Sequence, residues 1–328
     1  MGASIKKHKD SPLHHAIPFA LVVAATIVVT VVAENLALGR YFPHLARLPT
    51  DFSSHYLRRE LRYLAVQPPQ TIILGDSVLW GYRLQPDQTA VSILDARGCR
   101  CYNLSFKLSS PPNYYALARL MQTFGVHPAA VVVEVSQRVL NPANDAYRSL
   151  HPGVAQLADP LLSKRDRRLL TPTVHPTDLE GVVASFSLLF AMRADIRETL
   201  YPQRESAPLL HPGESAFEGE YDLSPLDPQN VGVHFLMETV NFLRQQNVRT
   251  IAIMTPTNHG LLHDYIDGSE YRDNNLYLQR LLRRDGAEVV DLDRVFPTSE
   301  FYDDVHLTAA GQRKLASILS DVLSRQAH

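Results

Sequence analysis

The chain has 328 residues, of which 45% are hydrophobic and 20% are charged, so it is long and apolar enough to fold around a large core. Its formal net charge is −2 at pH 7, which gives no reason to expect nucleic acid as a partner. Two cysteines, Cys99 and Cys101, are too few for a disulfide-rich scaffold. We expect them to be packing residues rather than a redox or metal pair, because neighbours this close on one strand would bridge only with strain.

The N-terminus is basic and then strongly apolar. Three lysines in the first nine residues precede an uncharged stretch that ends at Ala33 and is about long enough to cross a bilayer. This pattern predicts a cytoplasmic tail over 1–15 and a transmembrane anchor over 16–34, with the bulk of the chain facing the periplasm or outer surface of a bacterium. A signal peptide cleaved after Ala33 is the alternative, and a buried core helix is disfavoured by the basic flank.

A juxtamembrane connector is expected over residues 35–68. Within it, residues 56–64 have helical spacing and a basic face. Such a face is typical either of a helix that touches anionic lipid headgroups or of a solvated helix. The pair Pro68-Pro69 marks the start of the main domain, which we expect to cover 69–328.

The first strand of this domain ends in a Gly-Asp-Ser turn. Residues 71–74 are apolar or β-branched, and Ser77 follows them at the predicted carboxyl end of a buried strand. Ligands of open α/β sheets bind at this edge, so Ser77 is a candidate nucleophile. Trp80, the only tryptophan, is a candidate for lining a substrate pocket, with plain core packing as the alternative.

Strands and helices then alternate along the chain. Four further strands are expected at 99–104, 129–135, 248–254 and 287–292. The expected helices cover 90–96, 114–123, 231–246, 275–284 and a last segment from the capping residue Thr308 to about 324. This alternation predicts an α/β fold of three layers, in which a parallel sheet of about five strands lies between helices.

Residues 141–228 interrupt the alternation. They are rich in Pro, Asp and Ser, with one expected helix at 185–201, and we interpret them as an insertion that forms a lid or specificity region. A basic run lies at 164–168. We expect this run to be a solvated face, with contact to an anionic polymer or lipid as the alternative.

Asp303 and His306 stand three residues apart, just before the last helix. The carboxylate can accept a hydrogen bond from one imidazole nitrogen and leave the other to take a proton from a serine. Asp304, the adjacent carboxylate, has the wrong spacing for this role.

A metal site is not expected. His259 and His263 are four residues apart and could share a helix face, but no third ligand motif joins them. We therefore expect neither a metal nor another cofactor.

The combination of Gly-Asp-Ser after the first strand with Asp-x-x-His after the last resembles the SGNH/GDSL hydrolase family. The resemblance covers about 69–140 and 228–325 and implies an SGNH-like, flavodoxin-like sheet. It implies Ser77 as nucleophile, His306 as general base and Asp303 as the residue that orients His306. The Gly-x-Ser-x-Gly elbow of α/β-hydrolases is absent.

Two blocks depart from the family's pattern. Ser105 stands where the family has an oxyanion-binding glycine, and its backbone N–H could still serve. The Gly-x-Asn-Asp block is absent, so Gln137 or Arg138 replaces the asparagine donor or the donor is missing. Asn258, after the fourth strand, is expected at the rim of the site.

These features predict an exported, membrane-anchored serine esterase or O-acyltransferase of the O-acetyl type that acts on a cell-envelope or extracellular polysaccharide. The chain is similar to SGNH proteins of alginate acetylation and teichoic acid D-alanylation, which implies a membrane-bound O-acyltransferase as partner. One alternative is a non-catalytic SGNH-like partner of such an acyltransferase. Another is a lipid esterase whose insertion forms a membrane-facing lid.

Overall fold

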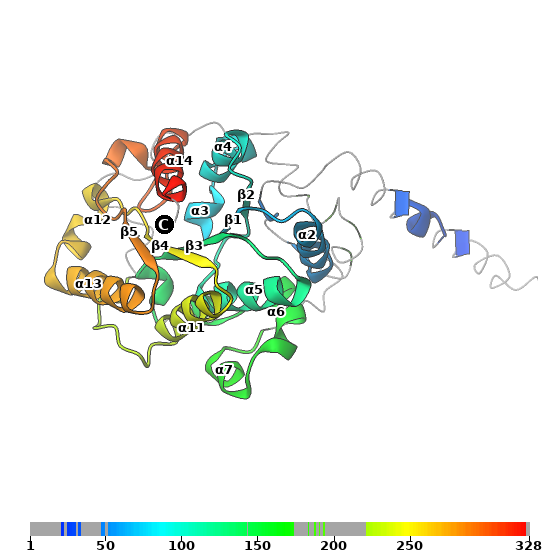
Figure 1. Cartoon of the computed structure of the whole chain (residues 1–328), viewed down its shortest axis with the longest axis horizontal. Helices are drawn as coiled ribbons and strands as arrows, with labels where there is room; N and C mark the ends of the chain where they lie inside the picture. The colour runs from blue at the N-terminus through cyan, green and yellow to red at the C-terminus, as the bar shows by residue number, and fades with distance from the viewer. Residues whose placement is uncertain are drawn as a thin grey trace, which may run out of the picture.

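The computed structural model in Figure 1 describes most of the predicted main domain. The described residues are 21–22, 25–30, 32–33, 47–49, 52–142, 144–173 and 221–325, with the single positions 183, 187, 190 and 193.

Five parallel strands form one sheet in the order β2-β1-β3-β4-β5. They are β1 (Thr71–Leu74), β2 (Cys101–Asn103), β3 (Ala130–Val135), β4 (Arg249–Met254) and β5 (Glu288–Asp291). The strand order reverses at β1, which lies between β2 and β3. Open α/β sheets bind ligands outside the carboxyl ends of the strands at such a switch point. The expected parallel sheet of about five strands is confirmed.

Helices cover both faces of the sheet, as Figure 1 shows. One face packs against α2 (Ser54–Val66), α5 (Pro111–Phe124), α6 (Pro152–Ala158), α11 (Val231–Gln245) and α13 (Ser269–Arg284). The other face packs against α4 (Ala90–Ala96) and α14 (Ala309–Ser324). Side chains of β3 alternate between the two cores, Val131 and Val133 into the first and Val132 into the second. The three expected layers are therefore present.

Shorter helices complete the domain. They are α3 (Ser77–Trp80), α7 (Lys164–Leu169), α12 (His259–Ile266) and the 3₁₀ turns Pro86–Gln88, Arg138–Leu140, Asp145–Arg148, Asp159–Leu161 and Thr298–Glu300. The sequence did not predict α12, and α13 begins six residues before the expected start at 275. Its first turn is polar apart from Tyr271, so its apolar spacing starts late.

The helix expected at 56–64 is part of α2, and Arg58 and Arg62 on its basic face are exposed as in the solvated alternative, but its other face is buried and so α2 is not a separate connector. Tyr56, Leu57, Leu61 and Leu64 are buried in the core that also holds β1 and β3. Residues 47–49 also belong to the fold, because Arg47 forms a parallel bridge with β2 and so covers the edge of the sheet. The domain therefore begins well before residue 69.

Ten of the 19 residues of the predicted anchor at 16–34 are described, namely 21–22, 25–30 and 32–33. Those described between 21 and 33 are helical, and their large side chains are exposed, with Leu21 at 65% and Val29 at 66%. Within the part of the chain that the structure describes, no helix has both the length and the apolar character needed to cross a membrane.

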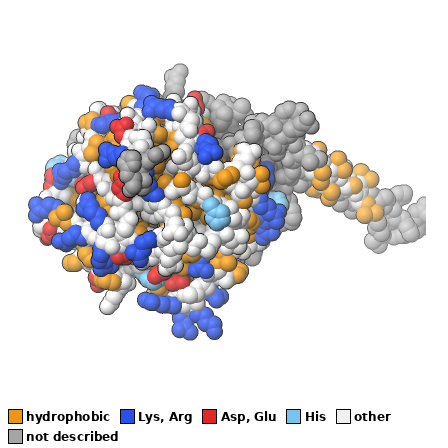
Figure 2. Space-filling view, viewed as in Figure 1, with side chains coloured by type: hydrophobic (Ala, Val, Ile, Leu, Met, Phe, Trp, Pro, Cys, Tyr) orange, Lys and Arg blue, Asp and Glu red, His pale blue; other side chains and the backbone are white. Residues whose placement is uncertain are grey.

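The longest described part of the insertion, 144–173, packs on the domain. α6 contacts both α2 and α5, and its residues Val154, Ala155 and Ala158 lie in the first core. The four basic residues of α7 are exposed, as expected for a solvated face, and Figure 2 shows Lys and Arg side chains gathered where Figure 1 places α7. The helix predicted at 185–201 lies almost wholly outside the described residues.

The two cysteines form a disulfide, so the prediction of unpaired packing residues is wrong. We expected one continuous strand over 99–104, but β2 begins only at Cys101. Arg100 lies in the left-handed region with φ 49°, and this turn brings Cys99 and Cys101 together with Cα atoms 5.3 Å apart.

Candidate active site

Ser77, His306 and Asp303 form a hydrogen-bonded row at the carboxyl edge of the sheet. His306 Nε2 lies 2.8 Å from Ser77 Oγ, and His306 Nδ1 lies 2.8 Å from Asp303 Oδ2 and 3.0 Å from its Oδ1. All three residues are buried: Ser77 is 9% exposed, His306 3% and Asp303 5%. This is the arrangement in which a serine, a base and an orienting carboxylate act as a unit.

The loop that carries Asp303 is held by its own hydrogen bonds. Oδ1 of Asp303 accepts from the backbone N–H groups of Val305 and His306. Burial raises the pKa of the Asp303 carboxyl, but the hydrogen bonds and charge of His306 outweigh it, and the net pKa lies below the ordinary value. Asp303 is therefore held ionised beside the imidazole.

Asn258 does not lie at the rim of the site as predicted. It is buried, its side-chain Nδ2 donates to the carbonyl of Asp303, and its backbone N–H donates to the carbonyl of Asp304. Asn258 thus ties the end of β4 to the loop that carries His306, which makes it a positioning residue.

The turn that presents Ser77 is capped by Asp76. The Asp76 carboxylate accepts from the Val78 N–H at 2.7 Å at the start of α3. The backbone N–H of Asp76 donates to Glu134 Oε2 at 2.6 Å. A Cβ at Gly75 would lie only 2.4 Å from that same oxygen, so the first position of Gly-Asp-Ser has no room for a side chain.

Arg138 is committed to this turn and not to an oxyanion. Its guanidinium pairs with the Asp76 carboxylate and donates to the Tyr147 hydroxyl at 2.8 Å, with 2% of Arg138 exposed. Glu134 lies in the same cluster, and burial together with the Asp76 charge raises the pKa of its carboxyl well above the ordinary value. Glu134 was not predicted from the sequence, although a charged residue within an apolar strand is a usable signal.

The other two expected oxyanion donors are also engaged. The N–H of Ser105 donates to Asn103 Oδ1 at 2.9 Å, while its hydroxyl has no hydrogen-bond partner within the described residues. Gln137 donates to the carbonyl of Tyr271 at 2.7 Å and accepts from Asn274, so it fixes α13 against β3. The donor set expected from the sequence is therefore not aimed at Ser77 in this structure.

The aromatic residue beside the triad is Tyr82, not Trp80. Trp80 is completely buried and its indole N–H donates to the carbonyl of Leu48 at 2.7 Å, so it packs the core rather than lining a pocket. The half-buried Tyr82 ring lies 4.6 Å from the His306 ring, centroid to centroid. No sequence motif marks Tyr82. Its position beside His306 follows from the turn at Gly81, which has a φ of 85°.

The two histidines considered for a metal each contact a carboxylate. His259 Nε2 is 3.0 Å from Asp293 Oδ2, and His263 Nε2 is 3.0 Å from Asp264 Oδ1. Among the residues that the structure describes, no group of three or more His, Cys, Asp or Glu side chains could hold a metal ion.

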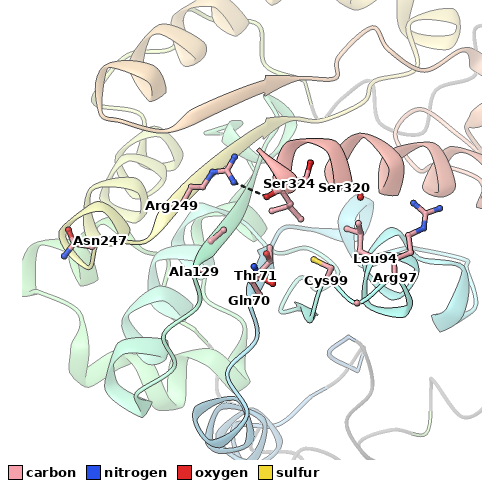
Figure 3. Close-up of a pocket in the computed structure, with 13 residues that line it drawn as sticks. Gln70, Thr71, Leu94, Arg97, Cys99, Ala129, Asn247, Arg249, Ser320 and Ser324 are labelled. Atoms are coloured by element: carbon pink, nitrogen blue, oxygen red, sulfur yellow. Dashed lines mark hydrogen bonds between the residues drawn. The ribbon is translucent and has the colours of Figure 1, made fainter. Parts of the chain in front are cut away.

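A pocket of about 620 Å³ lies at the opposite edge of the sheet. Figure 3 shows Thr71 and Arg249 in its wall, which are the first residues of β1 and β4, with Cys99 of the disulfide nearby. Ser77 follows the other end of β1. The pocket therefore cannot hold a substrate for Ser77.

Comparisons with known proteins give limited matches. A protein-family model matches residues 229–327, which is 99 of the 328 residues, and none of the curated proteins matches. Among solved structures, a candidate acylhydrolase from Bacteroides fragilis NCTC 9343 is similar at 10% identity and a TM-score of 0.44, over 83% of this chain and 97% of its own.

Two esterases are similar at the same level. The psychrotrophic esterase EstA from Pseudoalteromonas sp. shares 13% identity, with a TM-score of 0.39 over 78% of this chain and 97% of its own. A catalytic mutant of an acetylxylan esterase from Geobacillus stearothermophilus shares 10% identity, with a TM-score of 0.39 over 78% of this chain and 94% of its own. The TM-scores of these three structures are all below 0.5, so the similarities say nothing about the function of this chain.

Proposed function

We propose that the chain is an SGNH-type serine esterase or O-acyltransferase of the O-acetyl type that acts on a cell-envelope or extracellular polysaccharide. One observation carries this proposal: His306 joins Ser77 Oγ and the Asp303 carboxylate through contacts of 2.8 Å on its two ring nitrogens. A serine, a base and a carboxylate in this order are the parts that acyl transfer requires.

The geometry supports a two-step reaction. Ser77 Oγ attacks the carbonyl carbon of an ester as its proton passes to His306 Nε2, while Asp303 stabilises the resulting imidazolium. The bond to the leaving oxygen then breaks, the leaving alcohol takes the proton, and the acyl group remains on Ser77. Water or a sugar hydroxyl next gives a proton to His306 and attacks the acyl carbon, the bond from that carbon to Ser77 Oγ breaks, and His306 returns the proton to Ser77. Water yields a free acid, and a sugar yields a new ester.

Export and membrane anchoring are part of the same proposal. Three features support them: the lysines before the apolar N-terminal stretch, the exposed apolar side chains of the described residues between 21 and 33, and the Cys99–Cys101 disulfide. Disulfides persist mainly in oxidising compartments such as the periplasm or the cell surface. A membrane-bound O-acyltransferase that supplies the acyl group is the proposed partner.

The experiment uses the full chain, purified in detergent, with p-nitrophenyl acetate as acyl donor. Nitrophenol release is measured with and without a free oligosaccharide, and transfer is read by mass spectrometry of the sugar. We expect release that Ser77→Ala and His306→Ala abolish. Acetylated sugar identifies a transferase, and release without sugar acetylation identifies an esterase. Equal release by wild type and both variants would rule out the proposal.

A second candidate function is a non-catalytic partner of a membrane acyltransferase. The specific observation in its favour is that the Ser105 N–H, Gln137 and Arg138 are all bound to other protein groups. Loss of one oxyanion donor typically lowers turnover about a hundred- to a thousandfold. This candidate predicts no release above background and co-purification with the acyltransferase.

A further inference from the structure

We propose that Tyr82, Arg83 and Lys107 form a subsite beside the triad that binds a carboxylate or phosphate group of the substrate polymer. This inference rests on the proposed function and adds the charge of the substrate to it. The subsite is built by two loops, one after α3 and one after β2, which both leave the carboxyl edge of the sheet.

Tyr82 links the subsite to the reacting atoms. Its ring contacts the His306 ring at 4.6 Å, and Lys107 Nζ lies 5.0 Å from the centre of the same Tyr82 ring. The guanidinium carbon of Arg83 lies 5.4 Å from that centre. One aromatic ring thus lies beside both cations and the histidine that bonds Ser77. A group bound by these cations would lie next to an ester positioned at Ser77.

The two cations are placed where a ligand can reach them. Arg83 and Lys107 are each partly exposed. Within the part of the chain that the structure describes, Arg83 makes no ion pair, and its buried Nε has no hydrogen-bond partner. A guanidinium with an unused donor prefers a planar oxyanion such as a carboxylate or phosphate.

The backbone of both loops is unusual at these positions. Arg83 has φ 64° and Leu108, next to Lys107, has φ 59°. Residues other than glycine rarely adopt this left-handed conformation, and when they do they cluster at binding and catalytic sites. Leu108 is also 61% exposed, so an apolar side chain stands in solvent beside the cations. An apolar surface next to a charge suits the ring of an acidic sugar.

The first experiment measures binding with the Ser77→Ala chain, which needs no turnover. Isothermal titration calorimetry compares a galacturonate hexamer, which carries a carboxylate on each sugar, with a neutral xylose hexamer. We expect the acidic hexamer to bind more tightly, and the preference to fall as NaCl rises from about 0.05 to 0.5 M. An oligomer of glycerol phosphate forms a third arm, which separates phosphate from carboxylate recognition.

Variants then assign the preference to residues. Arg83→Gln and Lys107→Gln should each weaken binding of the acidic hexamer about three- to tenfold, as expected for partly exposed charge pairs. Arg97→Gln removes the same charge at the opposite edge of the sheet, where Arg97 is exposed, and should leave binding unchanged. Thermal unfolding of each variant checks that the domain is intact.

The outcomes separate this subsite from the proposed function. The subsite would be overturned if the acidic and neutral hexamers bound equally. It would also be overturned if Arg97→Gln weakened binding of the acidic hexamer as much as Arg83→Gln or Lys107→Gln. If wild type binds the acidic hexamer through Lys107 but releases no nitrophenol from p-nitrophenyl acetate, the subsite stands and the esterase proposal fails. If release is normal but the double variant R83Q/K107Q binds the acidic hexamer as wild type does, the subsite fails alone.

Discussion

The two edges of the sheet hold their polar groups in different ways. At the carboxyl edge, Asp303 and Asp76 are buried, and each is paired with a cationic or ionisable side chain. At the amino edge, the ion pair of Arg249 with Glu288 is partly exposed, with side chains 22% and 36% accessible, beside a pocket of about 620 Å³.

The described hollow at the amino edge is thus separate from the row formed by Ser77, His306 and Asp303. At the carboxyl edge, each buried charge has a partner that offsets its desolvation. At the amino edge, the Arg249–Glu288 pair remains partly solvated beside the pocket. The proposed function therefore rests on the paired buried groups and not on the pocket.

The largest expected effect is on catalysis at the carboxyl edge. Ser77→Ala and His306→Ala should each lower kcat for p-nitrophenyl acetate about a thousandfold or more, because the nucleophile and base act together. Arg97→Gln, at the amino edge, is the matched control and should retain wild-type kcat. The comparison fails if Arg97→Gln is as inactive as the triad variants.

The next effect is on stability. Arg138→Met removes the partner of the buried Asp76 and should lower the free energy of unfolding by about 3–5 kcal/mol. Arg249→Met at the amino edge should cost about 1 kcal/mol, because that pair is partly solvated. Urea denaturation followed by circular dichroism measures both. Equal losses would show that the two edges do not differ as described.

A pH dependence should also arise from the loops of the carboxyl edge. His151 stacks on Phe52 at 4.1 Å, and burial lowers the pKa of its imidazole to about 4 from the ordinary 6.5. The unfolded chain therefore binds the proton more readily, so stability is complete above pH 6.5 and is lost as pH falls from 6.5 to 4. The loss is at most about 3 kcal/mol.

The variant His151→Phe keeps an aromatic ring against Phe52 but cannot titrate. Urea unfolding at pH 4.5, 5.5 and 7.5 should show a shallower slope of stability against pH for this variant than for wild type. An unchanged slope would mean that another group carries the acid sensitivity.

The smallest expected effect lies in the disulfide at the amino edge. The double variant C99S/C101S should lower the free energy of unfolding by about 1–2 kcal/mol, because the closed loop is very short. Nitrophenol release should remain at the wild-type level, since Cys99 lies at the edge opposite Ser77. A large loss of activity would mean that the disulfide affects Ser77 at the other edge of the sheet, which the structure gives no reason to expect.

The sequence predicted features that depend on local pattern. Apolar β-branched runs identified all five strands, and the parallel arrangement placed Ser77 and the Asp303–His306 loop at one edge. Their contact follows because the carboxyl ends of β1 and β5 face the same side.

Features that depend on distant partners could not be predicted in this way. The orientation of Gln137 is set by α13, and the burial of α2 is set by the core that it meets. The disulfide depends on a left-handed residue, Arg100, which gives no pattern in the sequence. Tyr82 is placed on His306 by a glycine turn, so its neighbour in space is 224 positions away in the chain.

The central claim is that Ser77 is an activated nucleophile. The direct measurement is intact-protein mass spectrometry of the full chain after incubation with a fluorophosphonate, beside Ser77→Ala and Asp303→Asn. The account predicts one adduct on wild type that maps to Ser77, none on Ser77→Ala, and slow labelling of Asp303→Asn. No adduct on wild type, or an equal adduct on Ser77→Ala, would contradict it.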